Sequence, residues 1–354
     1  MNILLLTFKT DRGNALADAL NKIGHTVSVD EIGKKESSII GNLYRVISSY
    51  FKHHGKYDLV ITECFDYNGM LALSLSFFEN TPYVLYVKGF SPDDARENTN
   101  RLTRFLDEKL NHMIFSRARA IAYISSHLKQ KYEEHFRKEK KDEYLSIPSK
   151  VIHHSIDESY FKMEKVESIE KKMLYVGNLD FKGKAEGVVF LLKMIKNHYE
   201  TPSFSLSIVG GGSYLPFVQS LAKEYGLRNV EFHGLLDIKE LQALYRNSSL
   251  FVYPSFQDAF PTVAMEAQAM GLPAIVTDTS GAAEVVIDGK TGYVVEAEPD
   301  TFHNAAFQLL NDDELLKSMS DASKMNIEQN FTWEKSAKKF DDFFASFIIK
   351  KSRI

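Results

Sequence analysis

Residues 253–284 read Y-P-S-F-Q-D-A-F-P-T-V-A-M-E-A-Q-A-M-G-L-P-A-I-V-T-D-T-S-G-A-A-E. An apolar strand leads into this stretch, and its first loop carries Asp258. The apolar spacing predicts a short helix from about Thr262 to Met270. Gly271 and Pro273 are signals that end a helix, and a buried strand is expected from Ala274. The stretch therefore predicts one strand–helix–strand step of a parallel sheet.

The start of this helix is typical of an anion site. The first N–H groups of a helix have no partner within it, so they attract negative groups and tolerate Pro261 beside them. Glu266 lies one turn beyond Thr262 on the same helical face. Asp258 and Glu266 therefore flank a candidate phosphate site.

Length and composition favour a folded chain with two domains. The chain has 354 residues, 44% hydrophobic and 25% charged, with a net charge of −4 that gives no basic field for nucleic acid. Cys64 is the one cysteine, which excludes an internal disulfide and favours a reducing compartment. The first ten residues read as a strand, and no window approaches the ~20 apolar residues of a membrane span. We expect a cytoplasmic protein that is able to contact the inner face of a membrane peripherally.

Strands and helices alternate through both halves of the chain, which predicts α/β architecture with doubly wound parallel sheets. We expect Rossmann-like domains at residues 1–160 and 161–335, with a linker near residues 158–170. Residues 336–354 are expected to form a helix that packs back on the first domain. Ligands of such proteins bind in the cleft between the domains.

The first half has candidate ligand-binding residues where its expected strands end. Its first loop has one glycine and no G-x-G-x-x-G, so the dinucleotide fingerprint of an NAD-dependent dehydrogenase is absent. In open α/β sheets the carboxyl ends of strands bind ligands. By that rule the candidates are Arg12, Gly13, Glu63, Asp66 and Lys88. The alternative is an ordinary turn or solvated loop charges.

Residues 101–119 predict an amphipathic helix. Leu102, Leu106, Leu110 and Met113 share one face, with basic residues at both ends. Packing on the sheet is the expected role, and contact with a membrane surface is the alternative.

Ordered motifs in the second half resemble one large family. They are G-N-L-D-F-K-G-K at 177–184, V-G-G-G at 209–212, F-H-G at 232–234, P-S-F-Q-D-A-F-P-T-V-A-M-E-A-Q-A-M-G-L-P-A at 254–274, S-G-A-A-E at 280–284 and D-G-K-T-G-Y-V-V at 288–295. In this order they resemble the retaining, nucleotide-sugar-dependent glycosyltransferases of the GT-B fold. That family includes phosphatidylinositol mannosyltransferases, sucrose synthases and bacterial glycogen synthases. The resemblance runs from about Met173 to Trp333.

In its second half the sequence departs from the family pattern at four places. Asp258 replaces the first glutamate of E-x7-E and is one methylene shorter. Pro261 replaces a glycine and has no N–H, so phosphate binding would depend on Thr262 and Val263. Asn178 replaces the arginine of the donor-binding element. The lysine of that element comes one residue early, as Lys182, unless Lys184 takes its role.

The resemblance implies a function and roles for these residues. It implies transfer of a sugar from a nucleotide-diphosphate sugar to a saccharide, lipid or small-molecule acceptor, with retention and without a metal or other cofactor. Asp258, Lys182 and Glu266 are the catalytic candidates, with Glu266 on the ribose and Asp258 on the donor sugar. The donor-binding candidates are Gly177, Asn178, Lys184, Gly210, Gly212, Pro261, Thr262, Val263, Glu266, Gly281 and Glu284.

Two other functions remain open from the sequence. A nucleotide-sugar-binding protein with a decayed active site is suggested by Asn178 and Pro261. A GT-B-fold nucleotide-sugar epimerase would need more acid and base groups than the motifs supply. The adjacent His153 and His154 have no third ligand at suitable spacing, so no zinc site is expected. Neither the acceptor nor the oligomeric state can be read from the sequence.

Overall fold

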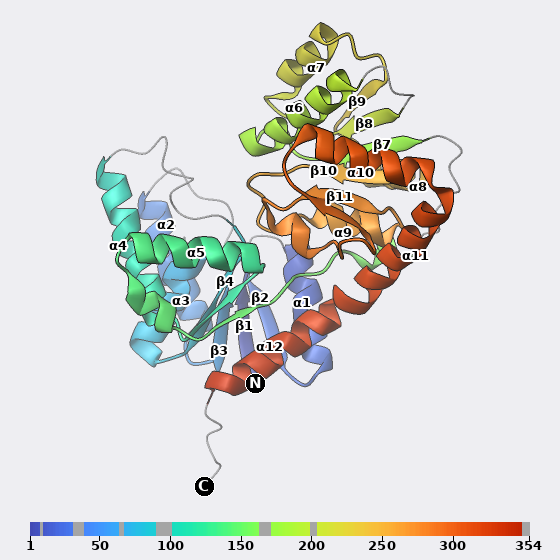
Figure 1. The fold of residues 1–354 in the computed structure, drawn as a ribbon. Helices are drawn as coiled ribbons and strands as arrows, with labels where there is room; N and C mark the ends of the chain where they lie inside the picture. The colour runs from blue at the N-terminus through green and yellow to red at the C-terminus, as the bar shows by residue number, and fades with distance from the viewer. Residues whose placement is uncertain are drawn as a thin grey trace. The chain divides into compact units, whose positions relative to one another are not determined.

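The computed structural model describes residues 1–7, 10–30, 39–63, 67–89, 101–162, 171–198 and 204–348. The chain divides into two compact units (Figure 1). The first comprises Met1–His154 together with Trp333–Ile354, and the second comprises Ser155–Thr332. Each unit is built on its own six-stranded sheet, and every strand pair is parallel.

The first sheet has the order β2-β1-β3-β4-β5-β6. Its central strands are buried on both faces, which explains their continuous apolar sequences. The strands are β1 (Asn2–Leu6), β2 (Thr26–Asp30), β3 (Leu59–Thr62), β4 (Tyr83–Val87), β5 (Ala120–Tyr123) and β6 (Ser149–Val151).

Helices cover both faces of the first sheet. In Figure 1, α1 and α12 lie together on one side, and the helices that connect β2 through β6 lie on the other. On the second side α3 packs between α2 and α4. The elements are α1 (Thr10–Lys22), α2 (Ile39–His53), α3 (Tyr67–Glu79), α4 (Arg101–Arg117), α5 (Ser126–Lys138), η2 (Asp142–Ser146) and α12 (Trp333–Phe347).

The second sheet has the order β12-β11-β10-β7-β8-β9. Its members, all described in full, are β7 (Lys172–Val176), β8 (Ser205–Val209), β9 (Val230–Gly234), β10 (Leu250–Tyr253), β11 (Ala274–Thr277) and β12 (Gly292–Val295). Helix α6 packs against α7 and α10, and α9 packs against α11 and η3. These elements are η3 (Glu158–Lys162), α6 (Lys182–Asn197), α7 (Leu215–Glu224), α8 (Ile238–Asn247), α9 (Thr262–Ala269), η4 (Gly281–Glu284), α10 (Pro299–Asn311) and α11 (Asp313–Asn330).

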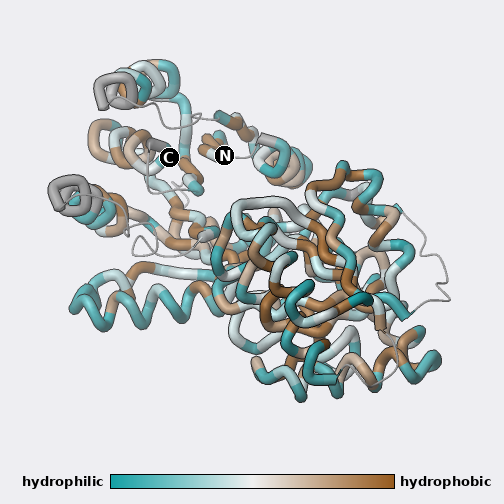
Figure 2. The backbone as a smooth tube through the Cα atoms, turned by 90° about the horizontal axis from the view of Figure 1, so that it is seen from above, coloured by the Kyte–Doolittle hydropathy of each residue, from teal (hydrophilic) through white to brown (hydrophobic). Residues whose placement is uncertain are grey.

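The hydropathy of the chain follows these layers. Figure 2 shows outer helices whose turns alternate between brown and teal, as amphipathic helices over a sheet require. Among the described helices, none combines the length and apolar character needed to cross a bilayer.

Each sheet has one point where the strand order reverses. In the first unit β1 and β3 are neighbours although β2 lies between them in sequence, and in the second unit β7 and β10 are neighbours. Connections leave such a point in opposite directions, so a crevice opens at the carboxyl ends of the two strands. The fold therefore provides one candidate ligand position in each unit.

The predicted fold class is confirmed, and the buried strand expected from Ala274 is observed as β11. Two predicted loops are wrong. Gly13 lies inside α1, and Lys182 begins α6 rather than standing in a loop before it. In both places a glycine that reads as a break allows close packing instead, because a Cβ on Gly13 would lie 2.5 Å from Thr7 Cγ2.

Large tyrosines are buried in both units, and burial raises their pKa values. Tyr83, Tyr86 and Tyr123 are in this position in the first unit, and Tyr175, Tyr245 and Tyr253 in the second. These phenols therefore stay protonated in the folded protein at a pH that ionises them in the unfolded chain.

We predict that stability falls as pH rises above about 10, the ordinary tyrosine pKa. There the unfolded chain releases protons that the folded chain retains, and each such tyrosine costs about 1.4 kcal/mol per pH unit. Tyrosine ultraviolet absorbance and far-ultraviolet circular dichroism, recorded together through an alkaline titration, test this. The buried phenols should ionise only as the helices unfold. Their full ionisation in a folded chain would contradict the prediction.

Candidate functional site

The candidate site of the second unit lies at its reversal point, between β7 and β10. The loop after β7 leads into α6, which carries Lys184, and the loop after β10 carries Asp258 and leads into α9. The two loops thus place a lysine and a carboxylate, 74 residues apart in sequence, at one crevice.

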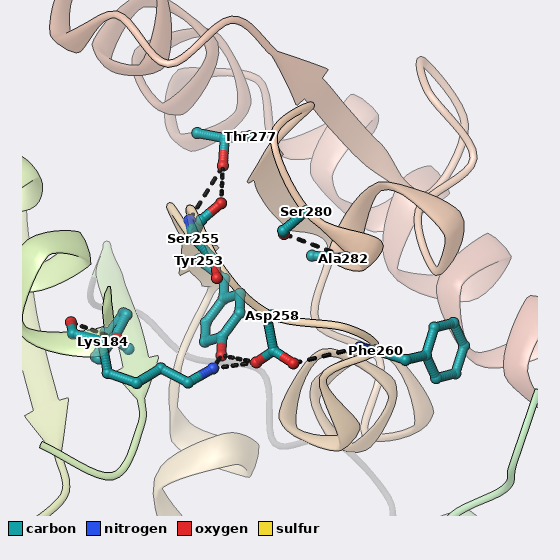
Figure 3. Close-up of polar contacts among 9 residues, drawn as sticks. Lys184, Tyr253, Ser255, Asp258, Phe260, Thr277, Ser280 and Ala282 are labelled. Carbon is teal, nitrogen blue, oxygen red and sulfur yellow. Dashed lines mark hydrogen bonds and ion pairs between the residues drawn. The ribbon is translucent and has the colours of Figure 1, made fainter. Parts of the chain in front are cut away.

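Lys184, Asp258 and Tyr253 form one polar cluster (Figure 3). The Lys184 ammonium donates to Asp258 Oδ2 and to Tyr253 Oη, and Tyr253 Oη donates to the same carboxylate oxygen at 2.7 Å. The lysine Nζ also lies 4.7 Å from the centre of the Tyr253 ring. The side chains of Lys184 and Asp258 are only 20% and 19% exposed, so water screens this ion pair weakly.

Close packing of α6 against β10 positions Lys184. A Cβ at Gly187 would lie 2.3 Å from the Pro254 carbonyl oxygen, so only glycine allows the helix to approach this closely. Tyr175 Oη donates to the Lys184 carbonyl at 2.9 Å, and the Tyr175 ring stacks on Tyr253 with 5.6 Å between centres. The lysine backbone and its target are therefore fixed by the same pair of rings.

The structure distinguishes the two lysines of the element. The Lys182 side chain is 76% exposed and pairs with Glu186 at 3.8 Å on the outer surface of α6. Lys184 reaches Asp258, whereas Lys182 does not, so the structure places Lys184 and not Lys182 in this cluster. The reason is that α6 begins at Lys182, and residues two positions apart on a helix point in different directions.

The loop that carries Asp258 is held by the loop that contains Gly281. Phe260 N–H donates to Asp258 Oδ1 at 3.3 Å, and Gly281 N–H donates to the Asp258 carbonyl at 2.9 Å. A Cβ on Gly281 would lie 1.8 Å from the Ala259 carbonyl oxygen. Gly281 thus packs one loop on the other, and its N–H is already used within the protein.

A second bridge joins the same two strand ends. Thr277 Oγ1 donates to the Ser255 carbonyl at 3.0 Å, and Ser255 N–H donates back to Thr277 Oγ1 at 3.0 Å. Ser280 Oγ accepts from Ala282 N–H at 3.3 Å and caps η4 (Figure 3).

Helix α9 starts at the crevice, as the sequence predicts. Pro261 is the residue before its first turn, and Thr262 and Val263, which begin the helix, are half-buried. Glu266 is half-buried one turn further, and Tyr245 Oη donates to Glu266 Oε2 at 3.3 Å. Burial, and then the negative charge of Glu266, raise the pKa of Tyr245, so its hydroxyl remains a donor.

Three glycines join the loops after β7 and β8. A Cβ on Gly210 would lie 1.8 Å from the Gly177 carbonyl oxygen, and a Cβ on Gly212 would lie 2.2 Å from Asp180 N. The φ angles of Gly210 and Gly212, 140° and 139°, are also in the region that favours glycine. Asn178 is exposed and accepts from Asp180 N–H at 2.9 Å, so this side chain organises its own loop.

The last residue of the predicted donor set, Glu284, ends η4 and is half-buried. It follows β11, the strand next to β10, so it lies in a loop at the same edge of the sheet.

The first unit has a similar cluster at its own reversal point. Thr7 Oγ1 donates to Glu63 Oε2 at 2.7 Å across the ends of β1 and β3, and Lys88 forms an ion pair with Glu63 Oε1. Lys88 Nζ lies 4.7 Å from the Tyr86 ring centre. Burial and then the negative charge of Glu63 raise the pKa of Tyr86, and the positive charge of Arg12 offsets part of that rise.

The structure thus brings together most of the candidate residues of the first unit. Glu63 and Lys88 are paired, Gly13 packs on Thr7, and Arg12 is close enough to act on Tyr86. Asp66 lies outside the described residues.

The buried tyrosines have supporting roles that the sequence motifs do not reveal. Tyr253 holds Asp258, Tyr245 holds Glu266, and Tyr175 supports Lys184. The available signal was tyrosine in two apolar strands, β7 and β10, and in helix α8, since a buried tyrosine needs a partner for its hydroxyl. In the described part of the chain, no group of three or more His, Cys, Asp or Glu residues is arranged to hold a metal ion.

Comparison with known proteins gives a family match in the second unit. Residues 157–325 match the family described as Glycosyl transferases group 1. An uncharacterized glycosyltransferase of Methanocaldococcus jannaschii is 27% identical over 271 residues, which cover 71% of this chain and 64% of that relative. The chain therefore spans less than two thirds of this curated relative's length.

Two solved structures share the fold over nearly the whole chain. Sucrose-phosphate synthase from Thermosynechococcus elongatus has a TM-score of 0.74 at 19% identity, covering 98% of both chains. Anabaena HepE, solved in complex with UDP-glucose, has a TM-score of 0.71 at 17% identity, covering 98% of this chain and 100% of that one. The match to the Glycosyl transferases group 1 family thus falls on the second unit, and the two parallel sheets have the GT-B architecture of these solved structures.

Proposed function

We propose that this protein is a retaining glycosyltransferase that moves a sugar from a nucleotide-diphosphate sugar to a saccharide, lipid or small-molecule acceptor without a metal ion. The observation that carries the proposal is the Lys184–Asp258 pair at the reversal point of the second sheet, beside the start of α9. A cation, a carboxylate and a helix start at one crevice are suited to a ligand that joins a diphosphate to a polyhydroxylated sugar.

The diphosphate is proposed to bind Lys184 and the first N–H groups of α9. Pro261 has no N–H, so the helix contribution would come from Thr262 and Val263. Charge develops on the diphosphate as the sugar bond breaks, and a fixed lysine and helix dipole stabilise that charge. Lys184 needs no large movement to act, because Tyr175 and Tyr253 already hold it at the crevice.

Asp258 and Glu266 are proposed to bind the hydroxyl groups of the donor. An ionised carboxylate accepts hydrogen bonds from hydroxyls, and each of these two is oriented by a buried tyrosine. We assign Asp258 to the sugar because it lies beside Lys184, and Glu266 to the ribose because it stands one turn further along α9. Attack on the same face of the sugar, with the departing phosphate accepting the acceptor's proton, would give retention.

The first unit is proposed to bind the acceptor. Its candidates are Arg12, Glu63 and Lys88, gathered where β1, β3 and β4 end. Glu63 accepts hydrogen bonds from both Thr7 and Lys88, so its negative charge is paired within the protein.

A decayed donor-binding protein is the second candidate, because Asn178 and Pro261 depart from the family pattern. The intact Lys184–Asp258 pair favours an active enzyme over that alternative. An epimerase is the third candidate, and would alter a sugar nucleotide without any acceptor.

We predict that a nucleotide-diphosphate sugar raises the thermal unfolding midpoint, since it binds only the folded state. A ligand at a hundred times its Kd stabilises by about 2.7 kcal/mol. UDP-, GDP- and ADP-sugars should be compared, beginning with UDP-glucose because HepE binds it. Release of the nucleotide diphosphate with candidate acceptors then measures transfer, and nuclear magnetic resonance of the product gives the anomeric configuration.

Each result of this panel separates the candidates. Binding by no nucleotide sugar and no nucleotide diphosphate would reject the proposal. Binding without turnover, in a protein whose biological activity survives Glu266→Ala, would indicate the decayed protein. A changed sugar nucleotide without acceptor would indicate the epimerase.

We predict opposite results for the two lysines of α6. Lys184→Gln should lower kcat roughly 10²–10³-fold, because it removes a charge that stabilises the departing diphosphate. Lys182→Gln, the matched control two residues away, should change kcat by less than about fivefold because its pair is exposed. Steady-state kinetics measure both, with circular dichroism to show that each variant folds. Equal losses in the two variants would exclude the assignment of Lys184.

A further inference from the structure

An exposed apolar face lies on α2 and α3 of the first unit. The side chains of Phe51 and Phe78 are 66% and 69% exposed, although phenylalanine is usually buried. The members of this face are Tyr44, Ile47, Phe51, Phe77 and Phe78. We call this set the aromatic face.

The aromatic face is one surface rather than scattered side chains. Tyr44, Ile47 and Phe51 follow helical spacing along one side of α2, and α2 packs against α3. The Tyr50 ring connects the helices, with its centre 5.6 Å from Phe51 and 5.7 Å from Phe78. Phe77 and Phe78 are themselves in edge contact at 5.2 Å.

Positive charge borders this face. Residues 39–56 contain Arg45, Lys52 and Lys56 and no Asp or Glu, in a chain whose net charge is −4. At the end of α4, the Arg117 guanidinium lies 5.5 Å from the Phe77 ring centre.

The nearby carboxylates are already engaged. Asp30 pairs with Lys52 at 3.1 Å and with His53 at 2.6 Å, and Glu79 accepts from Gly55 N–H at 2.7 Å. These two carboxylates keep their charge, but the four basic side chains of Arg45, Lys52, Lys56 and Arg117 outnumber them, so the border is net positive.

We propose that the aromatic face docks on an anionic lipid bilayer. Helices that lie in a membrane interface combine apolar and aromatic side chains on one side with Lys and Arg beside them, and a net negative chain needs such a local patch to approach anionic lipid. The phenylalanines would enter the boundary between headgroups and acyl chains. The lysine and arginine side chains would extend their charged ends to the lipid phosphates. Charge complementarity therefore favours a lipid surface over a second copy of this chain, whose own face would be equally positive.

The position of the face leaves the candidate acceptor residues accessible. Phe77 and Phe78 end α3, near the amino end of β4, whereas Lys88 follows the carboxyl end of that strand. Docking would thus hold the unit on a membrane without covering the reversal point. The helix at residues 101–119 is the other candidate for such contact, and the side chains of Leu102 and Leu106 on its apolar face lie outside those that the structure describes. Among the α4 side chains that the structure describes, Ile114 and Phe115 are buried and Met113 is an exposed large hydrophobic residue.

The test is sedimentation of the full chain with phosphatidylcholine vesicles that contain or lack phosphatidylglycerol. The wild-type chain should sediment with the anionic vesicles and much less with the neutral ones, and added salt should weaken the association because it screens exposed charges. The Phe51→Ser/Phe77→Ser/Phe78→Ser variant should partition at least ~tenfold more weakly, since three rings no longer enter lipid. Lys52→Gln/Lys56→Gln should reduce the preference for anionic vesicles while keeping the residual binding to neutral ones.

Phe217→Ser provides the matched control, because Phe217 is 55% exposed on α7 of the other unit. It should bind vesicles as the wild type does. An equal loss in Phe217→Ser, or equal binding of the wild type to neutral and anionic vesicles, would overturn the proposal. So would a lipid-free dimer, seen by sedimentation velocity, that the triple variant abolishes, because the face would then serve a second copy. The single variants Phe51→Ser and Phe78→Ser, each with a partial loss, keep the test decisive if the triple variant folds poorly.

Discussion

The second unit is organised around the ion pair between Lys184 and Asp258, because the Lys184 side chain is mostly buried. A cation that is 20% exposed requires nearby acceptors, and Asp258 and Tyr253 supply them. Meeting that requirement fixes the surrounding structure. Gly187 must lack a side chain so that α6 reaches β10, and the carbonyl of Asp258 must be held by Gly281 so that its carboxylate faces the lysine.

The same requirement appears in both units. In the first, Lys88 pairs with Glu63 and lies 4.7 Å from the ring of Tyr86, and in the second, Lys184 pairs with Asp258 and lies 4.7 Å from the ring of Tyr253. Strand ends at a reversal point open a crevice, and a polar crevice without ligand is stable only when its charges are satisfied internally. A lysine–carboxylate pair over a tyrosine ring is the solution in both.

The sequence predicts the architecture and the positions of the two acids in the fold, but it leaves open which lysine lies beside Asp258. Alternating strands and helices, with glycines at strand ends, predicted both sheets, and the D-x7-E spacing predicted that Asp258 and Glu266 flank the start of α9. The choice between Lys182 and Lys184 depends on the residue at which α6 begins. Helix ends are defined by capping and packing to within a residue or two, and a shift of that size turns a side chain away from the crevice. The supporting role of Tyr253 depends on contacts between residues of different loops and helices, so the sequence alone did not predict it.

The Lys184–Asp258 pair is also suited to being exchanged. Removing a charge pair from water costs free energy that its attraction only partly returns, so a partly buried pair contributes little net stability while it holds its members in place. In the proposed function, a diphosphate would offer Lys184 several oxygen acceptors in place of one carboxylate, and a sugar hydroxyl would offer Asp258 a donor in place of the ammonium. Tyr253, whose raised pKa keeps its proton, would remain a donor to Asp258 during this exchange. A site built this way is ordered before its ligand arrives and loses little stability when the ligand separates the pair.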